Sequence, residues 1–503
     1  MAEYIATDAD QATATSADGG IESQIDAALD WLRPHLVDLC RSMVGGLTPT
    51  DFFQFELALF GLLRDFGRLL LELLLNNLEG DGTCLPHDVV YFGQGYRRLG
   101  KKTRNAHVAT LFGTICLWRF PYRFWEPFVK ECCIFPLELQ LGLIEGVTPA
   151  LADCNGRRMA EAGATQNRVL QQLKEQCSVS MGVKRLRNLI AALSAGLSEH
   201  HQAAQIEALL AALRTAASSR GNRKPVLAVG RDGITLCEYT HRFWEVATTA
   251  TVTVFDRAGK RLTTVYLASR PELGQAMMSG MLTGLLTELF KKWDGPLPTL
   301  AYVADSGGKE SSYFEEVLAT MRHPLTGQPL GWQRIVDFYH AAERIWKMAD
   351  ALFGRGSSKS RKWASRMLTT LKRKRRGAKR VLHSAASLAA RRKMGKSRAK
   401  EFRKAYNYIR KRTKWMRYRD YKERHIPLGS GITEAACKII FTQRLKLSGM
   451  RWKPAGAQHI LNIRTVLLSR IWRATYGVLL ATRDASIPTA YELISQNTGR
   501  KAA

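Results

Sequence analysis

The sequence has few cysteines, and their spacing does not suit a disulfide framework or a zinc ribbon. Nine cysteines are scattered over 503 residues, and no two stand in the C-x₂-C spacing that zinc ribbons use. Cys84 and the pair Cys132–Cys133 flank a predicted hairpin at 107–120, but four ligands at workable spacing are missing. We therefore expect no zinc site and a reducing compartment.

The sequence also lacks a long uninterrupted apolar run. A bilayer-spanning helix needs about 20 nearly uncharged residues. The most apolar stretch, 52–78, is interrupted by Glu56, Arg64, Asp65, Arg68 and Glu72. The first 20 residues are polar, with no basic segment leading into an apolar one, and predict a disordered leader without a secretory signal. We expect no membrane partner and a cytoplasmic protein.

Acidic residues are scarce in one segment. Between Arg355 and Arg424 there are 28 Lys plus Arg against three acids, a net +25 within a chain of net charge +31. Such a density of positive charge attracts polyanions, and the phosphate backbone of nucleic acid is the usual one. Aromatic residues are interleaved with these charges, which favours nucleic-acid contact over a merely solvated face.

The hydrophobic periodicity divides the chain into successive regions. We expect a leader (1–20), a helical region with a possible role in oligomerisation (21–79), a small β-containing, degenerate ribbon-like module (80–145), a helical region resembling a helix-turn-helix (148–215), a catalytic core in two parts (225–340 and 426–480), an intervening basic helical insertion (341–425) and a tail (481–503).

The apolar helices at 21–79 admit two interpretations, an ordinary core or a dimer surface. In the 148–215 region, helices at 166–176 and 181–193 are joined by a short turn. Three basic residues near the start of the second helix occupy the positions at which a helix-turn-helix reads DNA: Lys184, Arg185 and Arg187.

The core has a distinctive order of elements. We predict strands at 226–232, 247–256 and 261–268, a helix at 271–292, a strand at 299–305, a helix at 311–321 and a strand at 332–337. Three antiparallel strands followed by alternating helices and parallel strands describe an α/β RNase H-like core, here a mixed sheet flanked by helices.

Three acids stand at positions that such a core would bring together. Asp232 and Asp305 each follow an apolar, β-prone run, and Glu434 opens a helical pattern. Three carboxylates suffice for two divalent cations, since Mg²⁺ retains water and takes only one or two carboxylates. Each acid alone has a structural alternative: Asp232 and Asp305 as turn residues, Glu434 as a partner of a helix dipole.

The motifs around these acids resemble those of bacterial insertion-sequence transposases of the DDE class, most closely the ISKra-type family. The matching segments are Gly230–Gly233, Val303–Gly307, Asp337–Ala341, Gly429–Lys438 and Arg444–Trp452, and the resemblance runs from about residue 80 to the end. It implies an RNase H-like fold, two Mg²⁺ or Mn²⁺ ions held by Asp232, Asp305 and Glu434, and binding to the element's terminal inverted repeats and to target DNA.

Asp337 and His340 resemble the acid-or-Cys, two-spacer, His signature that follows the second catalytic acid in Mutator and hAT transposases, where a helical insertion comes next. The resemblance implies that they position the scissile phosphate or its water. The structural alternative is that His340 caps or packs the following helix and that Asp337 pairs with a cation such as Arg344.

The sequence thus predicts a DNA transposase that cleaves element ends and transfers the 3′-OH strand, assembled on DNA as a homodimer or higher oligomer. Further candidate DNA contacts are Lys372, Arg373, Lys374, Arg375, Arg376, Arg444, Lys446, Arg451 and Trp452. The last four are alternatively part of a solvated helix face. Two rival functions remain: a structure-selective nuclease without strand transfer, and a non-catalytic DNA-binding protein derived from a transposase.

Overall fold

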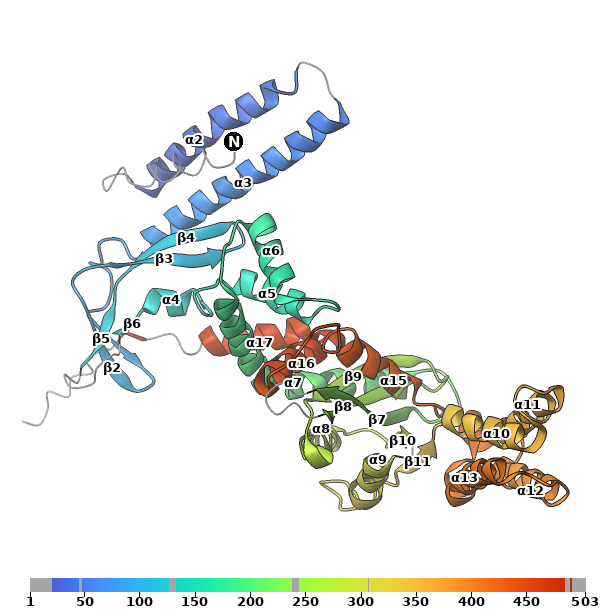
Figure 1. The fold of residues 1–503 in the computed structure, drawn as a ribbon. Coiled ribbons are helices and arrows are strands. Elements are labelled where there is room, and N and C mark those ends of the chain that lie inside the picture. Colours follow the sequence, from blue (N-terminus) through green and yellow to red (C-terminus); the bar gives the residue numbers. More distant parts are fainter. Residues whose placement is uncertain are drawn as a thin grey trace, which may run out of the picture. The chain divides into compact units, whose positions relative to one another are not determined.

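The computed structural model describes residues 20–44, 48–125, 133–237, 244–305, 307–484 and 489–490 (Figure 1). The chain forms two compact units. The first comprises residues 1–159, 164–196 and 476–503, and the second comprises 160–163 and 197–475. The predicted leader lies outside the described residues, as does most of the predicted tail. None of the described helices combines the length and apolar character that crossing a membrane requires.

The first unit contains helices, a five-stranded sheet and a separate hairpin. Its elements are α2 (Ile21–Arg41), α3 (Pro49–Asn77), β1 (Asp88–Tyr91), β2 (Gln94–Arg98), β3 (Thr103–Thr110), β4 (Gly113–Arg119), β5 (Tyr122–Phe124), β6 (Cys133–Ile134), α4 (Pro136–Gln140), α5 (Pro149–Ala160), α6 (Gln166–Cys177), the start of α7 (Val183–Ser218), most of α17 (Trp472–Asp484) and β12 (Thr489–Ala490). The sheet has the antiparallel order β12-β1-β2-β5-β6, and β3 pairs with β4 as the hairpin predicted at 107–120.

Helix α3 begins at a capping box. Thr48 Oγ1 accepts a hydrogen bond from the Asp51 amide, and Asp51 Oδ2 accepts one from the Thr48 amide, which satisfies two donors at the helix start. The C-terminal half of α3 packs on the β3–β4 hairpin, where Gly67 lies so close to the Phe112 ring that a Cβ would overlap it by ordinary contact standards. The helix is thereby fixed to the hairpin at one end.

The region 148–215, which the sequence predicts to be helical and to resemble a helix-turn-helix, is helical in the structure. Helices α6 and α7 do follow one another across a turn at Ser178, whose backbone is left-handed. However, α7 is 36 residues long, and its part up to Gly196 belongs to the first unit while the rest belongs to the second. The boundary was unpredictable from periodicity because apolar residues surround this helix on several sides.

The second unit is built on a mixed sheet. Its elements are the end of α7, β7 (Val226–Cys237), β8 (Trp244–Phe255), β9 (Arg261–Ser269), α8 (Ala276–Lys292), β10 (Thr299–Ala304), α9 (Gly308–Tyr313) with a π-helical turn (Phe314–Leu318), β11 (Gln333–Val336), α10 (Phe338–Phe353), α11 (Ser358–Arg373), α12 (Gly377–Ala390), α13 (Lys396–Arg412), α14 (Tyr418–Glu423), α15 (Gly431–Cys437) with a π-helical turn (Lys438–Thr442) and α16 (Pro454–Leu468). The strand order is β11-β10-β7-β8-β9. Strand β8 is antiparallel to β7 and β9, and β10 is parallel to β7 and β11.

The five strands start and end within a few residues of their predicted limits, except that β7 is longer. It continues five residues past Asp232 to Cys237 and stays paired with β8 throughout. The prediction that Asp232 lies at the end of its strand is therefore wrong, and the residue pairs with Thr249 in mid-strand. Gly233 does not end the strand, because β7 continues to pair with β8 as far as Cys237.

Strand alternation gives the sheet two distinct faces. Leu227 and Val229 of β7 join a core with α7 and α8, whereas Val226 and Ala228 join a core with the insertion helices. Asp232, an even position of the same strand, is therefore on the face opposite α8.

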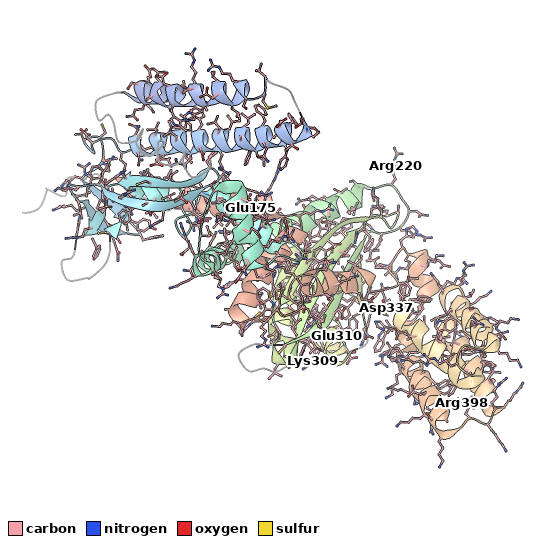
Figure 2. All side chains as sticks on the ribbon, turned by 45° about the horizontal axis from the view of Figure 1, so that its top comes forward. Glu175, Arg220, Lys309, Glu310, Asp337 and Arg398 are labelled. Carbon is pink, nitrogen blue, oxygen red and sulfur yellow. The ribbon has the colours of Figure 1, made fainter. Side chains whose placement is uncertain are left out.

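The basic insertion is helical, as predicted, and consists of α10 to α14 (Figure 1). Most of its aromatic residues form its core, whereas Tyr339 and Trp346 of α10 are 68% and 37% exposed. Trp363, Phe402, Tyr418 and Tyr421 are buried, and Tyr406, Tyr408 and Trp415 pack against the same cluster. The charges are left outside, as Figure 2 shows for Arg398 on α13.

The contact between β7 and α15 leads to a stability prediction. A Cβ at Gly230 would overlap Thr433 Oγ1, so we expect Gly230→Ala to destabilise the protein by about 1–3 kcal/mol through overpacking. The control is Gly280→Ala on α8, where a Cβ meets nothing within 4 Å and should stabilise the helix slightly. Thermal melting of both variants tests this, and equal melting temperatures would contradict it.

Candidate active site

Asp232 and Asp305 are level with one another on neighbouring strands. Tyr302 of β10 pairs with Val229 of β7 in parallel register. Continuing each strand by three residues sets Asp305, directly after β10, beside Asp232. Neighbouring strands are about 4.8 Å apart, and the charge of Asp305 contributes, after burial, to the raised pKa of Asp232. The two aspartates are therefore adjacent, as the sequence predicted.

Glu434 comes to the same place through the packing of α15. Thr433 Oγ1 is 2.7 Å from Thr251 Oγ1 of β8, and the absence of a side chain at Gly230 lets this turn of the helix approach β7. One turn further on, the Cys437 thiol hydrogen-bonds the Asp232 carboxylate. These contacts hold Glu434 over the strand that carries Asp232.

The carboxylates influence one another electrostatically. Burial raises the pKa of Asp232 above its ordinary value, and the charges of Glu434 and Asp305 raise it further, against hydrogen bonds from Gly233 and Cys437 that lower it. Burial also raises the pKa of the Cys437 thiol, with Asp232 and Glu434 contributing. The site therefore favours a proton or a cation over three bare charges.

A fourth carboxylate, Glu310, lies close enough to Asp232 and Asp305 to be affected by their charges, and it is not among the residues predicted from the sequence. It lies in the first turn of α9, and its carboxylate folds back over Gly307, where a Cβ would overlap Oε2. Burial raises its pKa, and the charges of Asp232 and Asp305 raise it further. Its position in the first helical turn after Asp305 is the signal that was available in the sequence.

Asp337 is a fully buried structural acceptor. Its Oδ1 accepts hydrogen bonds from the amides of Tyr339 (2.5 Å) and His340 (3.0 Å) and so caps α10. Its Oδ2 accepts bonds from the Ser430 amide and, at 2.8 Å, from the Ser430 hydroxyl. Among the described residues no ion pair joins Asp337 to Arg344: both Asp337 oxygens accept these hydrogen bonds, and the Arg344 guanidinium lies over the Tyr408 ring.

Ser430 connects Asp337 to Glu434. Its Oγ is 2.8 Å from Asp337 Oδ2 and also 2.8 Å from Glu434 Oε1. A hydroxyl carries one proton and can donate to only one of these oxygens. Glu434 is half exposed whereas Asp337 is fully buried, so the oxygens of Glu434 are the ones that solvent or a ligand can reach.

His340 faces the same carboxylate, with Nε2 3.7 Å from Glu434 Oε1. Ligand atoms of Asp337, His340 and Glu434 all lie within 4.8 Å of one another, and among the described residues this is the group with metal-binding spacing. Among the described residues, the predicted set Asp232, Asp305 and Glu434 does not reach that spacing, although the charges of Glu434 and Asp305 act on Asp232. Its all-oxygen donors suit Mg²⁺ or Mn²⁺, and the imidazole suits Mn²⁺ better than Mg²⁺.

The predicted DNA contacts on α7 differ in their availability. Arg185 donates hydrogen bonds to the carbonyls of Glu145, His107 and Gly146, and burial lowers its pKa. It therefore holds loops of the first unit together, and the prediction of a DNA contact there is corrected. Arg187 bonds Gln166 of α6 while remaining exposed, and Lys184 is exposed.

The predicted DNA contacts after Glu434 also include both buried and exposed residues. Arg444 is 1% exposed, and burial lowers its pKa to about 10. Trp452, half-buried, stacks 5.2 Å from that guanidinium and donates to the Leu445 carbonyl at 2.9 Å. Both are therefore packing residues, which corrects their assignment to DNA, whereas Lys446 and Arg451 are exposed.

The basic cluster at the end of α11 is mostly at the surface. Arg373, Lys374, Arg375 and Arg376 are exposed. Lys372 is half-buried, with Nζ 5.3 Å from the centre of the Phe338 ring, next to Asp337. The cluster is thereby connected to the start of the helix that carries His340.

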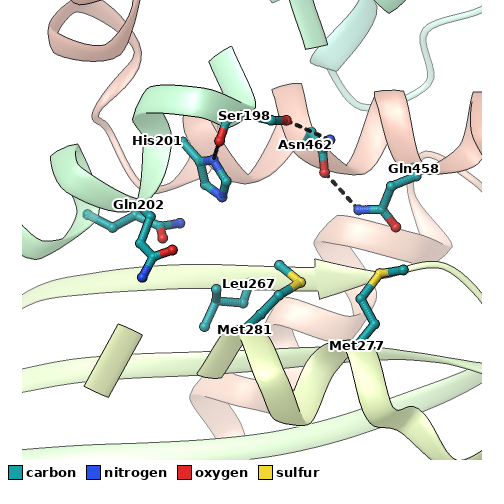
Figure 3. Close-up of a pocket in the computed structure, with 9 residues that line it drawn as sticks. Ser198, His201, Gln202, Leu267, Met277, Met281, Gln458 and Asn462 are labelled. Carbon is teal, nitrogen blue, oxygen red and sulfur yellow. Dashed lines mark hydrogen bonds between the residues drawn. The ribbon is translucent and has the colours of Figure 1, made fainter. Parts of the chain in front are cut away.

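A separate pocket lies at the other face of the sheet (Figure 3). It is lined by Ser198, His201, Gln202, Gln205, Leu267, Met277, Met281, Gln458 and Asn462. Leu267 belongs to the core on the α8 face, opposite Asp232, so the pocket contains none of the clustered acids. Burial lowers the pKa of His201 and keeps it neutral near pH 7.

Comparison with protein-family models and with curated proteins finds no match for this chain. The functional proposal therefore depends on the geometry of the site.

The raised pKa of Asp232 leads to a prediction about metal and stability. A carboxyl whose pKa is raised on folding contributes stability below its unfolded pKa, and this is lost as pH rises through the folded pKa. Near pH 7 we expect Asp232→Asn to melt a few degrees higher than wild type without metal. Mg²⁺ or Mn²⁺ should raise the melting temperature of the wild type but not of this variant, because metal needs the ionised ligand.

The control is Asp294→Asn, an exposed acid away from the cluster, which should melt and respond to metal as the wild type does. An Asp232→Asn protein that gained as much from metal as the wild type would contradict a role for Asp232 as a ligand.

Proposed function

We propose that the protein is a DDE transposase of a bacterial insertion sequence. The observation that carries the proposal is the convergence of Asp232, Asp305 and Glu434, from two parallel strands and a helix some 130 residues later, on one face of the sheet. A strongly basic helical insertion lies between the second and third acid. Three carboxylates that could hold divalent metal ions, together with a basic insertion that could bind phosphates, fit the cleavage of phosphodiester bonds in DNA.

The proposed fold of the second unit is RNase H-like. In support, three antiparallel strands are followed by two parallel strands that add on the other side of β7, with helices on both faces. The order of elements along the chain is the one expected for such a core, interrupted by an insertion before its last helices.

The proposed reaction has two steps at one site. Water attacks the phosphorus at the element's end, the bond to the 3′ oxygen breaks, and that oxygen leaves as a 3′-OH. The hydroxyl then attacks a target phosphodiester and releases a new 3′-OH there. Asp232, Asp305 and Glu434 would hold two divalent ions, which would lower the pKa of the attacking water and stabilise the leaving oxygen.

The residues around the acids have supporting roles in this proposal. Asp337 caps α10 and fixes Ser430, so it positions Glu434 without ligating metal itself. His340, 3.7 Å from Glu434, is placed to orient the scissile phosphate or its water. The exposed basic residues Arg373–Arg376, Lys446 and Arg451, and Lys184 and Arg187 of the first unit, remain the candidates for contact with terminal and target DNA. In this proposal the protein acts in the bacterial cytoplasm, bound to the nucleoid.

The first functional prediction concerns the acids. We expect Asp232→Asn, Asp305→Asn and Glu434→Gln each to reduce cleavage of an element end by at least about 10³-fold, since each removes a ligand charge. Binding of the uncut end should stay close to wild type. Asp294→Asn is the matched control and should cut normally. Near-normal cutting by the Glu434→Gln protein would remove the third acid from the site.

A pre-cut end separates the proposal from its rivals. A transposase joins a labelled 3′-OH end to target DNA, whereas a nuclease without strand transfer cuts but does not join. A non-catalytic DNA-binding protein does neither.

The second functional prediction concerns the insertion. If Arg373, Lys374, Arg375 and Arg376 bind phosphates, neutralising all four to Gln should flatten the plot of log affinity against log salt, by about 0.9 for each phosphate that is no longer neutralised. The control replaces Arg220, Arg223 and Lys224, exposed basic residues of a loop before β7, and should leave the slope nearer to wild type. An unchanged slope in the first variant would make its cluster a solvated face.

A further inference from the structure

The pocket of the second unit has the size of a small molecule. It is lined by residues of α7, β9, α8 and α16 and contains none of the clustered acids (Figure 3). Its volume of about 240 Å³ exceeds the roughly 150 Å³ that holds a benzene ring in an engineered cavity. It is smaller than the roughly 300 Å³ at which drug-sized sites begin. The pocket therefore has room for one small ring system.

One wall of the pocket is held by a chain of hydrogen bonds between side chains. Asn462 Nδ2 donates to Ser198 Oγ at 2.8 Å, and Gln458 Nε2 donates to Asn462 Oδ1 at 2.7 Å (Figure 3). Gln458 Oε1 accepts in turn from the Arg270 amide at 2.9 Å. These bonds connect α16 to α7 and to the residue after β9, so the polar groups of this wall are ordered before a ligand binds.

His201 presents a hydrogen-bond acceptor to the pocket. Its Nδ1 lies 2.9 Å from the Ser198 carbonyl oxygen, which can only accept, so Nδ1 carries the proton. Burial lowers the pKa of His201, so the ring is neutral near pH 7 and Nε2 is an acceptor. Among the described residues no group donates to Nε2. Figure 3 shows the ring directed from α7 towards Leu267 and Met281.

Gln202 adds donors and an acceptor next to His201. Its side chain is exposed and makes no hydrogen bond to any residue that the structure describes. Its Nε2 would lie 3.7 Å from a Cβ at Gly284 of α8, so the glycine leaves room for this carboxamide. A carboxamide can bind an amino group and a neighbouring ring nitrogen with two parallel hydrogen bonds, as glutamine does with N6 and N7 of adenine.

The described residues that line the pocket carry no charge near pH 7. Besides the amides, the hydroxyl and the neutral imidazole, they are Leu267, Met277 and Met281. Methionine sulfur makes favourable contacts with aromatic rings. A phosphate or an ammonium group would meet no opposite charge in this lining, which disfavours nucleotides and a nucleic-acid backbone as occupants. A neutral ring is the occupant that fits.

We propose that the pocket binds a small neutral heteroaromatic molecule whose amino group stands beside a ring nitrogen, which is the chemistry of a free aminopurine. The amino group would donate to His201 Nε2 and to the Gln202 carbonyl, and the Gln202 amide would donate to the ring nitrogen. The ring would lie against Leu267, Met277 and Met281. The site is independent of the clustered acids, so the binding proposal and the proposed reaction can each fail without the other.

Isothermal titration of the full chain with adenine, after nucleic acid has been removed, tests the proposal. We expect a dissociation constant below about 1 mM, which a ligand of roughly ten heavy atoms can reach. N6,N6-dimethyladenine lacks the N–H donors and should bind at least about 10-fold more weakly, because His201 Nε2 would lose its donor. A dissociation constant for adenine above about 1 mM overturns the proposal, as does equal binding of the dimethyl compound.

Two variants locate the binding in this pocket. His201→Phe keeps a ring of similar size but removes the acceptor, and should weaken adenine binding at least about 10-fold. Gln202→Leu changes an exposed side chain, so it remains decisive if His201→Phe lowers stability, and it should also weaken binding about 10-fold. The control His383→Phe replaces an exposed histidine of α12 and should bind adenine like the wild type. Wild-type affinity in either pocket variant would contradict the assignment.

Discussion

The candidate site depends on one close contact, between the first turn of α15 and the middle of β7. Gly230 leaves room for Thr433, whose hydroxyl is 2.7 Å from that of Thr251 on β8. This contact brings residues more than 200 positions apart in sequence together, and it decides where Glu434 stands relative to Asp232. The glycine next to Arg231-Asp232 is therefore a requirement of packing, and the acid motif cannot be separated from it.

A second constraint ties the insertion to the same place. Asp337 starts α10 by capping it, and through Ser430 it also fixes the turn that precedes α15. One fully buried carboxylate thus connects the beginning and the end of the insertion at the point where both meet the sheet. Helix α10 also carries His340, which faces Glu434, and it contacts Lys372 through Phe338. A movement of the basic helices would therefore change the position of His340 relative to Glu434.

The sequence was sufficient for the five strands of the second unit, apart from the end of β7, because alternation, β-propensity and the order of elements are local signals. In the first unit it predicted the β3–β4 hairpin but not the individual strands of the five-stranded sheet. The sequence-based predictions were wrong for side chains whose burial depends on residues distant in the chain. Arg185, Arg444 and Trp452 looked like surface residues, yet each is used internally, since side-chain burial is set by tertiary neighbours that periodicity does not name. The insertion's aromatics were misassigned for the same reason: alternation of Lys or Arg with Tyr or Trp is also the pattern of an amphipathic helix with an aromatic core. Glu310 and Ser430 were missed because neither stands in a motif whose chemistry is evident without its neighbours.

Charge is distributed unevenly along the chain. The insertion gathers +25 within 70 residues, whereas the helical hairpin at 21–77 is net negative. In the proposed function, phosphate would therefore be attracted to the insertion and repelled from the hairpin. The same uneven distribution of charge would direct nucleic acid to the insertion rather than to α3.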